Sequence, residues 1–340
     1  MAILKRIATG VSITAGDPTN RRDILLSDIN RIGYGAAATG GSNVVEVNNE
    51  SQFWAAVGTT GNYLQLTSSM TGVTITRDST FNTYANDLTI DASLASGFRF
   101  LVGGSFPTNG YIFRIHGDNI ILHNFEGQGV DYPSNKANNS FINIYGQDIW
   151  IDKISGANFD DDFVNLLNAC TNVTVSRCKT RNTNKSVFNW NPNAADKDTR
   201  VTVHSCDLSS EQRSPWLSAG RAHALCNWIH GGGEGSVAGR TFDQSDGYYN
   251  HNQIAEMIVE GNVFEGQTFH SIAAHTEANG NEGYIDSIDN DLSSGSGLSG
   301  TANINTVSSP QLFTIPYDYS AIKRSSSLVK AHVQSVAGST

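Results

Sequence analysis

Three ionisable side chains recur at wide and similar intervals in the middle of the chain. Asp161, Lys185 and Arg213 are separated by 24 and 28 residues. A carboxylate beside two cations forms a site that handles anions, because ammonium and guanidinium groups make charge-assisted hydrogen bonds to carboxylates. Residues this far apart in the sequence need a repeating fold to bring them to one surface.

Short runs rich in β-branched residues recur from about residue 63 onward, and Asn, Gly, Asp and Ser separate them. Such runs predict short strands joined by turns. Six runs can be overlaid in one register, starting at Ile120, Ile149, Val173, Val201, Ala222 and Met257. In three consecutive runs, the residue seven positions after the sixth residue of the run is ionisable. These residues are Asp161, Lys185 and Arg213.

This loose repeat, with offsets between 21 and 35 residues, predicts a solenoid. The strands have no helices between them, so the predicted fold class is all-β, a parallel β-helix whose stacked coils bury a continuous core. If the turns between strands were equally long, Asp161, Lys185 and Arg213 would form a column on one outer face. Neighbouring members of such a column lie roughly 4.8 Å apart.

Composition excludes several other classes of protein. The 340 residues carry a net charge of −10, which argues against non-specific binding of nucleic acid. No run of about 18 apolar residues occurs, so we expect no membrane-spanning helix. The predicted partners therefore include neither nucleic acid nor a membrane, and we expect the protein to be a monomer.

Four cysteines are too few for a disulfide scaffold, and no C-x-x-C pair suggests zinc. Cys178 and Cys206 fall in the same column of the overlay. They are either two buried thiols that fill an interior column or a disulfide between neighbouring coils.

The N-terminal part of the chain differs from the rest. Residues 1–30 are polar and lack a clear period, so we interpret them as an arm or linker that precedes a single β-helix domain at 31–340. Within that domain, 44–58 predicts a strand, an N-cap at Asn49 or Ser51, and a short amphipathic helix that caps the β-helix.

Four segments resemble the pectate lyase family, polysaccharide lyase family 1. QRSPWLSAGRAHALCNW (212–228) resembles the family's R-x-P-x-x-R-x-G-x-x-H-x-x-N-N, and DDFVN with NVTVS (161–176) resembles its D-x-x-x-D followed by V-T-V-S. RIGYGAAATGG (31–41) is similar to the family's N-terminal Gly-rich loop, and TIPYDY with SLVKAHVQSVAG (314–338) to its C-terminal tail. The segments occur in the family's order.

The resemblance implies a right-handed parallel β-helix and a lyase that cleaves an acidic, uronate-containing glycan such as pectate by β-elimination. It implies that Arg213, the first Arg of R-x-P, accepts the C5 proton or stabilises the developing charge. Lys185 matches the family's carboxylate-binding lysine, 28 residues before that arginine. A guanidinium is effectively always charged, so the role of Arg213 stays open between these two.

Two departures from the family pattern concern substrate and metal binding. The family's second arginine falls at Ser218, so either one substrate contact is lost or Arg221 replaces it. The resemblance also implies a calcium cofactor, with ligand positions that fall here at Asp161, Asn165, Asn138 and Ser140. Amides and a hydroxyl in place of carboxylates weaken calcium binding, because affinity falls with ligand charge.

Two alternatives remain open at this stage. A β-helix glycoside hydrolase would use paired carboxylates, with Asp160, Asp161 and Asp162 as candidates, although the G-H-G and R-I-K segments of β-helix polygalacturonases are absent. A non-catalytic glycan-binding β-helix is the other. Because the glycan is extracellular, we expect an extracellular protein. No leader is recognised, so the leader was removed, or the protein is a phage-associated depolymerase carried on a virion.

Overall fold

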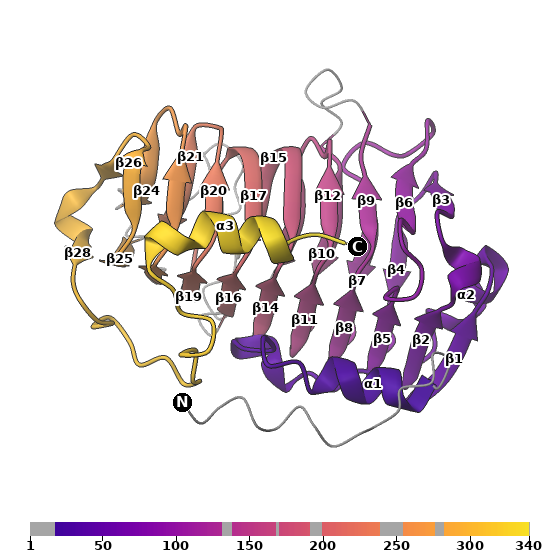
Figure 1. Ribbon diagram of the computed structural model, residues 1–340. Coiled ribbons are helices and arrows are strands. Elements are labelled where there is room, and N and C mark those ends of the chain that lie inside the picture. Colours follow the sequence, from indigo (N-terminus) through magenta and orange to yellow (C-terminus); the bar gives the residue numbers. More distant parts are fainter. Residues whose placement is uncertain are drawn as a thin grey trace.

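Parallel strands stacked coil upon coil make up most of this computed structural model, which describes residues 18–130, 138–167, 170–190, 199–238, 254–275 and 282–339. The short strand runs of the sequence form the coils, and successive coils pair in parallel throughout (Figure 1). The all-β parallel β-helix predicted from the repeat is therefore confirmed. Residues 1–17 of the expected arm lie outside the described residues.

One wall of the solenoid is an eleven-stranded parallel sheet that contains the runs overlaid from the sequence. The overlay is confirmed strand by strand, since Ile149 pairs with both Ile120 and Val173, and the pairing continues through Val201 and Ala222 to Met257. Its strands are β1 (Asn43–Val47), β2 (Asn62–Leu66), β5 (Leu88–Asp91), β8 (Ile120–His123), β11 (Ile149–Asp152), β14 (Val173–Ser176), β16 (Arg200–His204), β19 (Gly220–Leu225), β22 (Ile254–Glu260), β25 (Glu282–Ile288) and β28 (Ile304–Thr306).

The other strands form two parallel ladders that are joined into one sheet through the long strand β15 (Lys179–Trp190). The ladder that we call the β13 ladder contains β4 (Phe81–Thr83), β7 (Tyr111–Ile115), β10 (Ser140–Ile144), β13 (Asp162–Leu167), the second half of β15, β18 (Trp216–Leu217), β21 (Glu234–Ala238), β24 (His270–Ala274) and β27 (Leu298–Ser299). The third ladder contains β3 (Thr74–Arg77), β6 (Arg99–Val102), β9 (Glu126–Gln128), β12 (Ser155–Ala157), the first half of β15, β17 (Asp207–Gln212), β20 (Trp228–His230), β23 (Val263–Glu265) and β26 (Asp291–Ser294).

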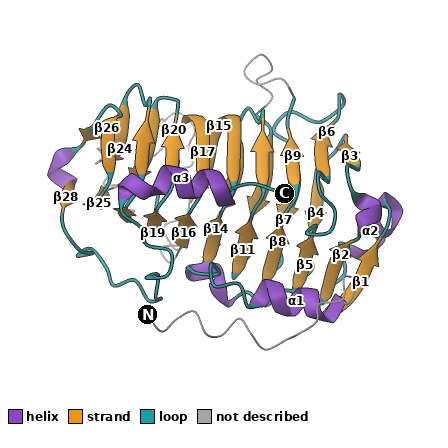
Figure 2. Cartoon of the chain, viewed as in Figure 1, coloured by secondary structure: helices purple, strands orange, loops and turns teal. Residues whose placement is uncertain are grey.

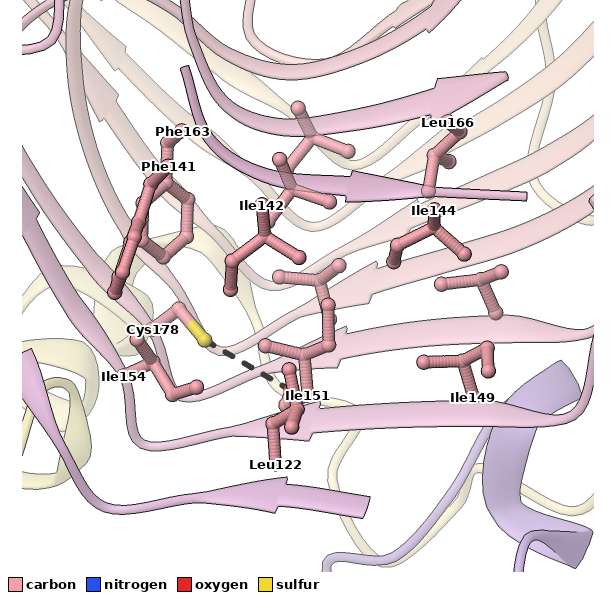
Figure 3. Close-up of a cluster of buried hydrophobic side chains, with 14 of the residues drawn as sticks. Leu122, Phe141, Ile142, Ile144, Ile149, Ile151, Ile154, Phe163, Leu166 and Cys178 are labelled. Carbon is pink, nitrogen blue, oxygen red and sulfur yellow. Dashed lines mark hydrogen bonds between the residues drawn. The ribbon is translucent and has the colours of Figure 1, made fainter. Parts of the chain in front are cut away.

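Aromatic side chains from neighbouring coils and ladders pack together in the interior, since stacked coils bury a continuous core. Phe100, Phe113, Phe125 and Phe141 are buried, and neighbouring rings lie 4.8–6.2 Å apart between centroids. Figure 3 shows Phe141 and Phe163 side by side above Ile154 and Cys178, with Ile142, Ile144 and Leu166 across the interior.

Cys178 and Cys206 are free, buried thiols in this interior, so the disulfide alternative is not formed. The backbone N–H of Cys178 points at Sγ of Cys206, 3.4 Å away. On the next coils asparagine takes over the same column. Nδ2 of Asn227 donates to Oδ1 of Asn262 at 3.0 Å, and Nδ2 of Asn262 donates to Oδ1 of Asn290 at 3.1 Å.

The predicted capping helix is confirmed as α2 (Glu50–Ala56), which follows β1 at the N-terminal end of the β-helix (Figure 2). Of the two candidate caps, Asn49 is the one that caps the helix: its side chain accepts a hydrogen bond from the backbone N–H of Gln52 at 3.0 Å. Phe53 carries the apolar face of the helix and is fully buried.

A segment before β1 lies along the outer face of the eleven-stranded sheet. The structure has a helix, α1 (Pro18–Leu26), within the part that was interpreted as arm or linker, and Leu25 is buried. A short 3₁₀ turn (Tyr34–Ala37) follows, and the N–H of Gly35 donates to Oγ1 of Thr174 at 2.8 Å. A Cβ at Gly35 would lie 2.1 Å from the carbonyl oxygen of Ile149, so only glycine permits this close approach.

The C-terminal helix α3 (Ser326–Val336) lies across the third ladder (Figure 1). Val329 and Val333 pack against Leu225 and Val263 in a small cluster of their own. No helix within the described ranges is both long enough and apolar enough to span a membrane.

Candidate functional site

Lys185 lies at the centre of a cluster of charged side chains on the β13 ladder. Only 6% of the residue is exposed, and its ammonium group forms an ion pair with Oδ1 of Asp161. Its Nζ also lies 3.4 Å from Oδ1 of Asp162, which is fully buried. The structure therefore brings Asp161 and Lys185 together as the sequence predicted.

The column predicted from equal turn lengths needs correction by one residue. Lys185 pairs in register with Asp162 and Gln212, and not with Asp161 and Arg213. Two sets of positions are aligned across these three coils: 155, 179 and 207, and then 162, 185 and 212. The number of residues between the two aligned positions falls by one from each coil to the next. Arg213 thus follows the last residue of β17 and sits in the turn before β18.

The backbone of Arg213 has a left-handed φ of 48°, a conformation that costs a non-glycine residue free energy and that clusters at functional sites. Cζ of Arg213 lies 4.3 Å from the ring centroid of Trp216, and Nε is 3.2 Å from Oε2 of Glu234. Only 7% of Arg213 is exposed. The guanidinium is thus held between an aromatic face and a carboxylate.

A cavity of about 790 Å³ opens beside Arg213. Glu234 and His270, which pair in register on β21 and β24, line it together with the exposed ring of Phe269. Residues 231–233 form the turn between β20 and β21, and Gly232 and Gly233 in this turn form part of the cavity wall. Arg213 therefore lies next to a space that can hold a ligand.

Sequence reasoning missed Glu234, although the overlay contained the signal for it. Asn227 occupies the sixth position of the next run, and seven residues beyond it lies Glu234. Applied to one more coil, the same offset that selected Asp161, Lys185 and Arg213 would have found the carboxylate that contacts Arg213. Trp216 carried no signal, because its contact with Arg213 depends on the turn between them.

Burial governs the electrostatics of the cluster. Burial, together with the charge of Asp161, raises the pKa of Asp162 well above its usual range, although Lys185 opposes the shift. Burial by itself would lower the pKa of Lys185, but the carboxylates of Asp162 and Asp161 outweigh it and raise that pKa. Lys185 therefore stays a cation, and Asp162 favours its neutral form.

The four residues predicted as calcium ligands do not form one cluster. Oγ of Ser140 is 3.4 Å from Oδ2 of Asp161, so these two meet. Asn138 instead donates from its side chain to Asn109 at 3.0 Å. Asn165 lies on β13 in register with Asn143 of β10 and Phe188 of β15, rather than with Ser140.

This donor set does not fit a resident calcium ion, which takes about six to eight oxygen ligands and favours several carboxylates. The one candidate carboxylate, Asp161, is already paired with the ammonium of Lys185. Within the described ranges no group of three acidic, histidine or cysteine side chains could hold a metal. The neutral amides of Asn143 and Asn165 lie along the same strands.

The structure places Ser218 and Arg221 away from the cations. Ser218 donates to Oδ1 of Asn189 at 3.3 Å, and Asn189 stacks in register with the interior residues Leu166 and Leu217. Arg221 is on β19 of the eleven-stranded sheet, where Nε pairs with Oε2 of Glu256 at 2.7 Å. Arg221 therefore does not replace the missing second arginine of the R-x-P segment.

The carboxylates proposed for a hydrolase are engaged elsewhere. Both oxygens of Asp160 accept backbone hydrogen bonds, from Asn138 at 2.5 Å and from Asn139 at 2.6 Å. With Asp161 paired to Lys185 and Asp162 fully buried, none of the three is arranged as an exposed acid and base pair. The geometry disfavours the hydrolase alternative.

Comparisons with known proteins support the parallel β-helix fold and show the family. The pectate lyase family model matches residues 27–340. No curated protein matches the chain. Among solved structures, pectate lyase II from Xanthomonas campestris pv. campestris is similar at 19% identity and a TM-score of 0.61, over 91% of this chain and 98% of that one.

Two further pectate lyase structures carry ligands in their descriptions. The enzyme from Bacillus sp. N165, in complex with trigalacturonate, is 17% identical with a TM-score of 0.58, over 91% of this chain and 98% of that one. Pectate lyase C from Erwinia chrysanthemi, at pH 9.5 with 30 mM Ca²⁺, is 16% identical with a TM-score of 0.59, over 90% of this chain and 95% of that one. Identities this low show the shared fold, while the family match covers nearly the whole sequence. The chain therefore belongs to the pectate lyase family of carbon–oxygen polysaccharide lyases.

Proposed function

We propose that this protein cleaves an acidic, uronate-containing glycan such as pectate by β-elimination at Lys185 and Arg213. The observation that carries the proposal is a pair of buried cations, Lys185 and Arg213, the second of which lines a cavity of about 790 Å³, in a chain whose net charge is −10. A local cationic site in an acidic protein is selective for an anionic ligand.

Lys185 binds the carboxylate of the uronate that reacts. Pairing with an ammonium withdraws charge from that carboxylate, so the neighbouring C5 proton becomes more acidic and the enolate-like intermediate is stabilised. Asp161 holds Nζ of Lys185 in place, and burial excludes water that would compete for the ammonium. Lys185→Gln should therefore lower kcat/KM by about 100-fold.

Arg213 acts on the C5 proton, either by accepting it or by stabilising the charge left behind. The C5–H bond breaks, and its proton passes to Arg213 or, where Arg213 only stabilises the charge, to a water molecule. The electron pair of that bond forms the C4–C5 double bond, and the C4–O bond to the leaving sugar breaks with its electrons on oxygen. The leaving oxygen then takes up a proton from solvent. Glu234 and Trp216 orient the guanidinium for this step.

The test is incubation with polygalacturonate, followed by ultraviolet absorbance for the unsaturated uronate and by a reducing-end assay. A lyase produces both signals, a hydrolase only reducing ends, and a glycan-binding protein neither. The matched control is Arg200→Gln, which changes an exposed arginine on β16 of the opposite sheet and should retain full activity. Absence of the unsaturated product on every uronate polymer tried contradicts the proposal.

Because such a glycan lies outside cells, we place the action of the protein outside the cell that produces it. The family's calcium supplies charge neutralisation when it is present, and here the amides at Asn143 and Asn165 and the paired Asp161 support a site that depends on its own cations instead.

A further inference from the structure

A second polar and aromatic patch lies on the β13 ladder, nearer its N-terminal end. We call it the Arg114 patch, and it consists of Tyr84, Tyr111, Arg114, His116 and Tyr145. Its members belong to or directly follow three neighbouring strands, β4, β7 and β10.

Strand register places Arg114 in the same row of positions across the β13 ladder as Trp216, whose ring contacts Arg213. Arg114 lies between the core residues Phe113 and Ile115, so its side chain points outward. Arg114 pairs in register with Asn82 of β4 and with Asn143 of β10. Asn143 pairs in turn with Asn165 of β13, the strand that also contains Asp162. Arg114 and Lys185 are three strand steps apart, about 14 Å along the helix axis.

The rings of the patch form a continuous stack. Tyr84 and His116 lie 4.4 Å apart at an interplanar angle of 9°, and His116 and Tyr145 lie 4.6 Å apart at 16°. Cζ of Arg114 is 4.8 Å from the ring centroid of Tyr111 and 6.0 Å from that of Tyr145. Contacts of this kind hold the guanidinium in place before any ligand arrives.

The patch has hydrogen-bonding capacity that no described residue satisfies. Arg114 has no carboxylate partner in the described part of the chain, and its Nε and the Nε2 of His116 are buried without an acceptor or donor. Asn143 is fully buried, and neither its amide oxygen nor its amide nitrogen has a partner among those residues. Buried polar groups are almost always hydrogen-bonded, so such a group points to a ligand or water.

An aromatic wall with an unpaired arginine suits one class of ligand. A guanidinium binds a carboxylate through two parallel hydrogen bonds, and tyrosine rings offer both apolar surface and hydroxyl groups to a sugar. Tyr84 at the end of the stack is 71% exposed, so the wall is accessible from solvent.

We propose that the Arg114 patch is an outer subsite, which binds the carboxylate of a uronate unit several sugars away from the bond that is cleaved. This inference rests on the proposed function, because it assumes that an acidic glycan lies across the β13 ladder. The patch then gives the protein a preference for long chains over short ones.

Calorimetric titration of the full chain with tri- and hexagalacturonate tests the subsite, in an Arg213→Ala background that cannot cleave the ligand. Adding Arg114→Gln should weaken hexamer binding by about 10-fold and trimer binding by less than 2-fold, since only the longer ligand reaches the patch. Arg99→Gln, which removes an exposed arginine on the third ladder, is the matched control and should bind both ligands normally. Tyr145→Phe, which retains the ring, separates loss of the stack from loss of a hydroxyl and should retain most of the hexamer affinity.

Two outcomes overturn the inference and are distinguishable. If the unsubstituted chain cleaves polygalacturonate but Arg114→Gln binds hexamer as tightly as its parent, the subsite is wrong and the proposed function stands. If the unsubstituted chain neither binds nor cleaves any uronate polymer, the proposed function fails and the subsite fails with it.

Discussion

Two buried clusters of charged residues lie on opposite walls of the β-helix and differ in how completely they are paired. On the eleven-stranded sheet, Arg177 contacts Oδ2 of both Asp152 and Asp28 at 2.6 Å, and Asp152 also lies 2.9 Å from Nδ1 of His123. On the β13 ladder, Asp162 is equally buried, and among the described residues its one ion-pair partner is the ammonium of Lys185, 3.4 Å from Oδ1.

The difference in pairing gives the two buried aspartates opposite pKa shifts. Burial would raise the pKa of Asp152, but the hydrogen bond from His123 and the charge of Arg177 outweigh it and hold that pKa well below its usual range. Burial dominates at Asp162 and raises its pKa. A buried carboxylate whose partners outweigh burial stabilises the fold and here fastens the segment that contains Asp28, whereas a buried carboxylate with a raised pKa is typical of functional sites.

The largest expected effect is on the β13 ladder. Arg213→Lys keeps the charge but loses the planar guanidinium, so we expect kcat/KM on polygalacturonate to fall by about 1000-fold with little change in thermal stability. Steady-state kinetics by ultraviolet absorbance, together with a melting curve, measure both quantities. Full activity in this variant would remove Arg213 from the mechanism and with it the contrast between the clusters.

On the eleven-stranded sheet we expect the reverse result. Arg177→Met leaves the buried Asp152 without its cation and should lower the free energy of unfolding by about 3–5 kcal/mol. The activity per folded molecule should stay at the unsubstituted level, because Arg177 lies on the opposite wall. Urea titration followed by assay of the folded fraction tests this, and Lys153→Met, which changes a half-buried cation in the turn after β11, serves as the control. A stability loss below about 1 kcal/mol would show that the cluster is not what fastens the N-terminal segment.

The pH dependence of stability should have opposite signs at the two aspartates. Because its folded pKa is lowered, Asp152 contributes stability above its unfolded value near 3.9, which is lost as the pH falls. The raised pKa of Asp162 means that its contribution is present at low pH and is lost as the pH rises through the folded value. Asp162→Asn should therefore gain stability relative to the unsubstituted chain as the pH rises above the unfolded value near 3.9.

The matched variant for this pH series is Asp152→Asn, and thermal melts in a constant-ionic-strength buffer measure both. Asp152→Asn should lose stability relative to the unsubstituted chain over the same pH interval. Parallel pH profiles for the two variants would show that the clusters do not differ in charge state.

The smallest expected effect is that of calcium removal. Since the candidate ligands do not gather around one point, a chelator should change kcat/KM by less than about 2-fold. Calorimetric titration with calcium in the absence of substrate should show no binding, and the double variant Asn143→Asp with Asn165→Asp should acquire it. A 10-fold loss of activity in chelator would mean that substrate completes a calcium site here.

The fold could be predicted from the sequence because its determinants are local and repeated. Each run from Ile120 to Met257 carries its own β-branched residues and turn signals, so a correct register follows from overlay alone. The column of Cys178 and Cys206 and the cap at Asn49 follow for the same reason.

The site could be predicted only in part, because its geometry depends on turn lengths and on contacts between coils. Counting residues identified Asp161, Lys185 and Arg213. It could not detect that the segment before the site is one residue shorter in each successive coil, which moves Arg213 into a turn. The position of Arg221 could have been predicted, because the overlay starts a run at Ala222 and so assigns Arg221 to the eleven-stranded sheet. The contact between Arg114 and Tyr145 joins residues 31 positions apart and has no sequence signal of its own.

The C-terminal tail has a mechanical consequence. Helix α3 packs on the coils that contain Leu225 and Val263, and the chain then continues to Gly338, whose N–H donates to the carbonyl of Arg177 at 2.7 Å. Ser339 donates to Oε1 of Glu126 at 3.1 Å, several coils further toward the N-terminal end. A solenoid held only by neighbouring coils can fray from its ends one coil at a time. The C-terminal tail joins coils that are not neighbours, so these coils must separate from the tail before they can unfold one at a time. The middle of the molecule, which contains Lys185 and Arg213, therefore opens as a single unit.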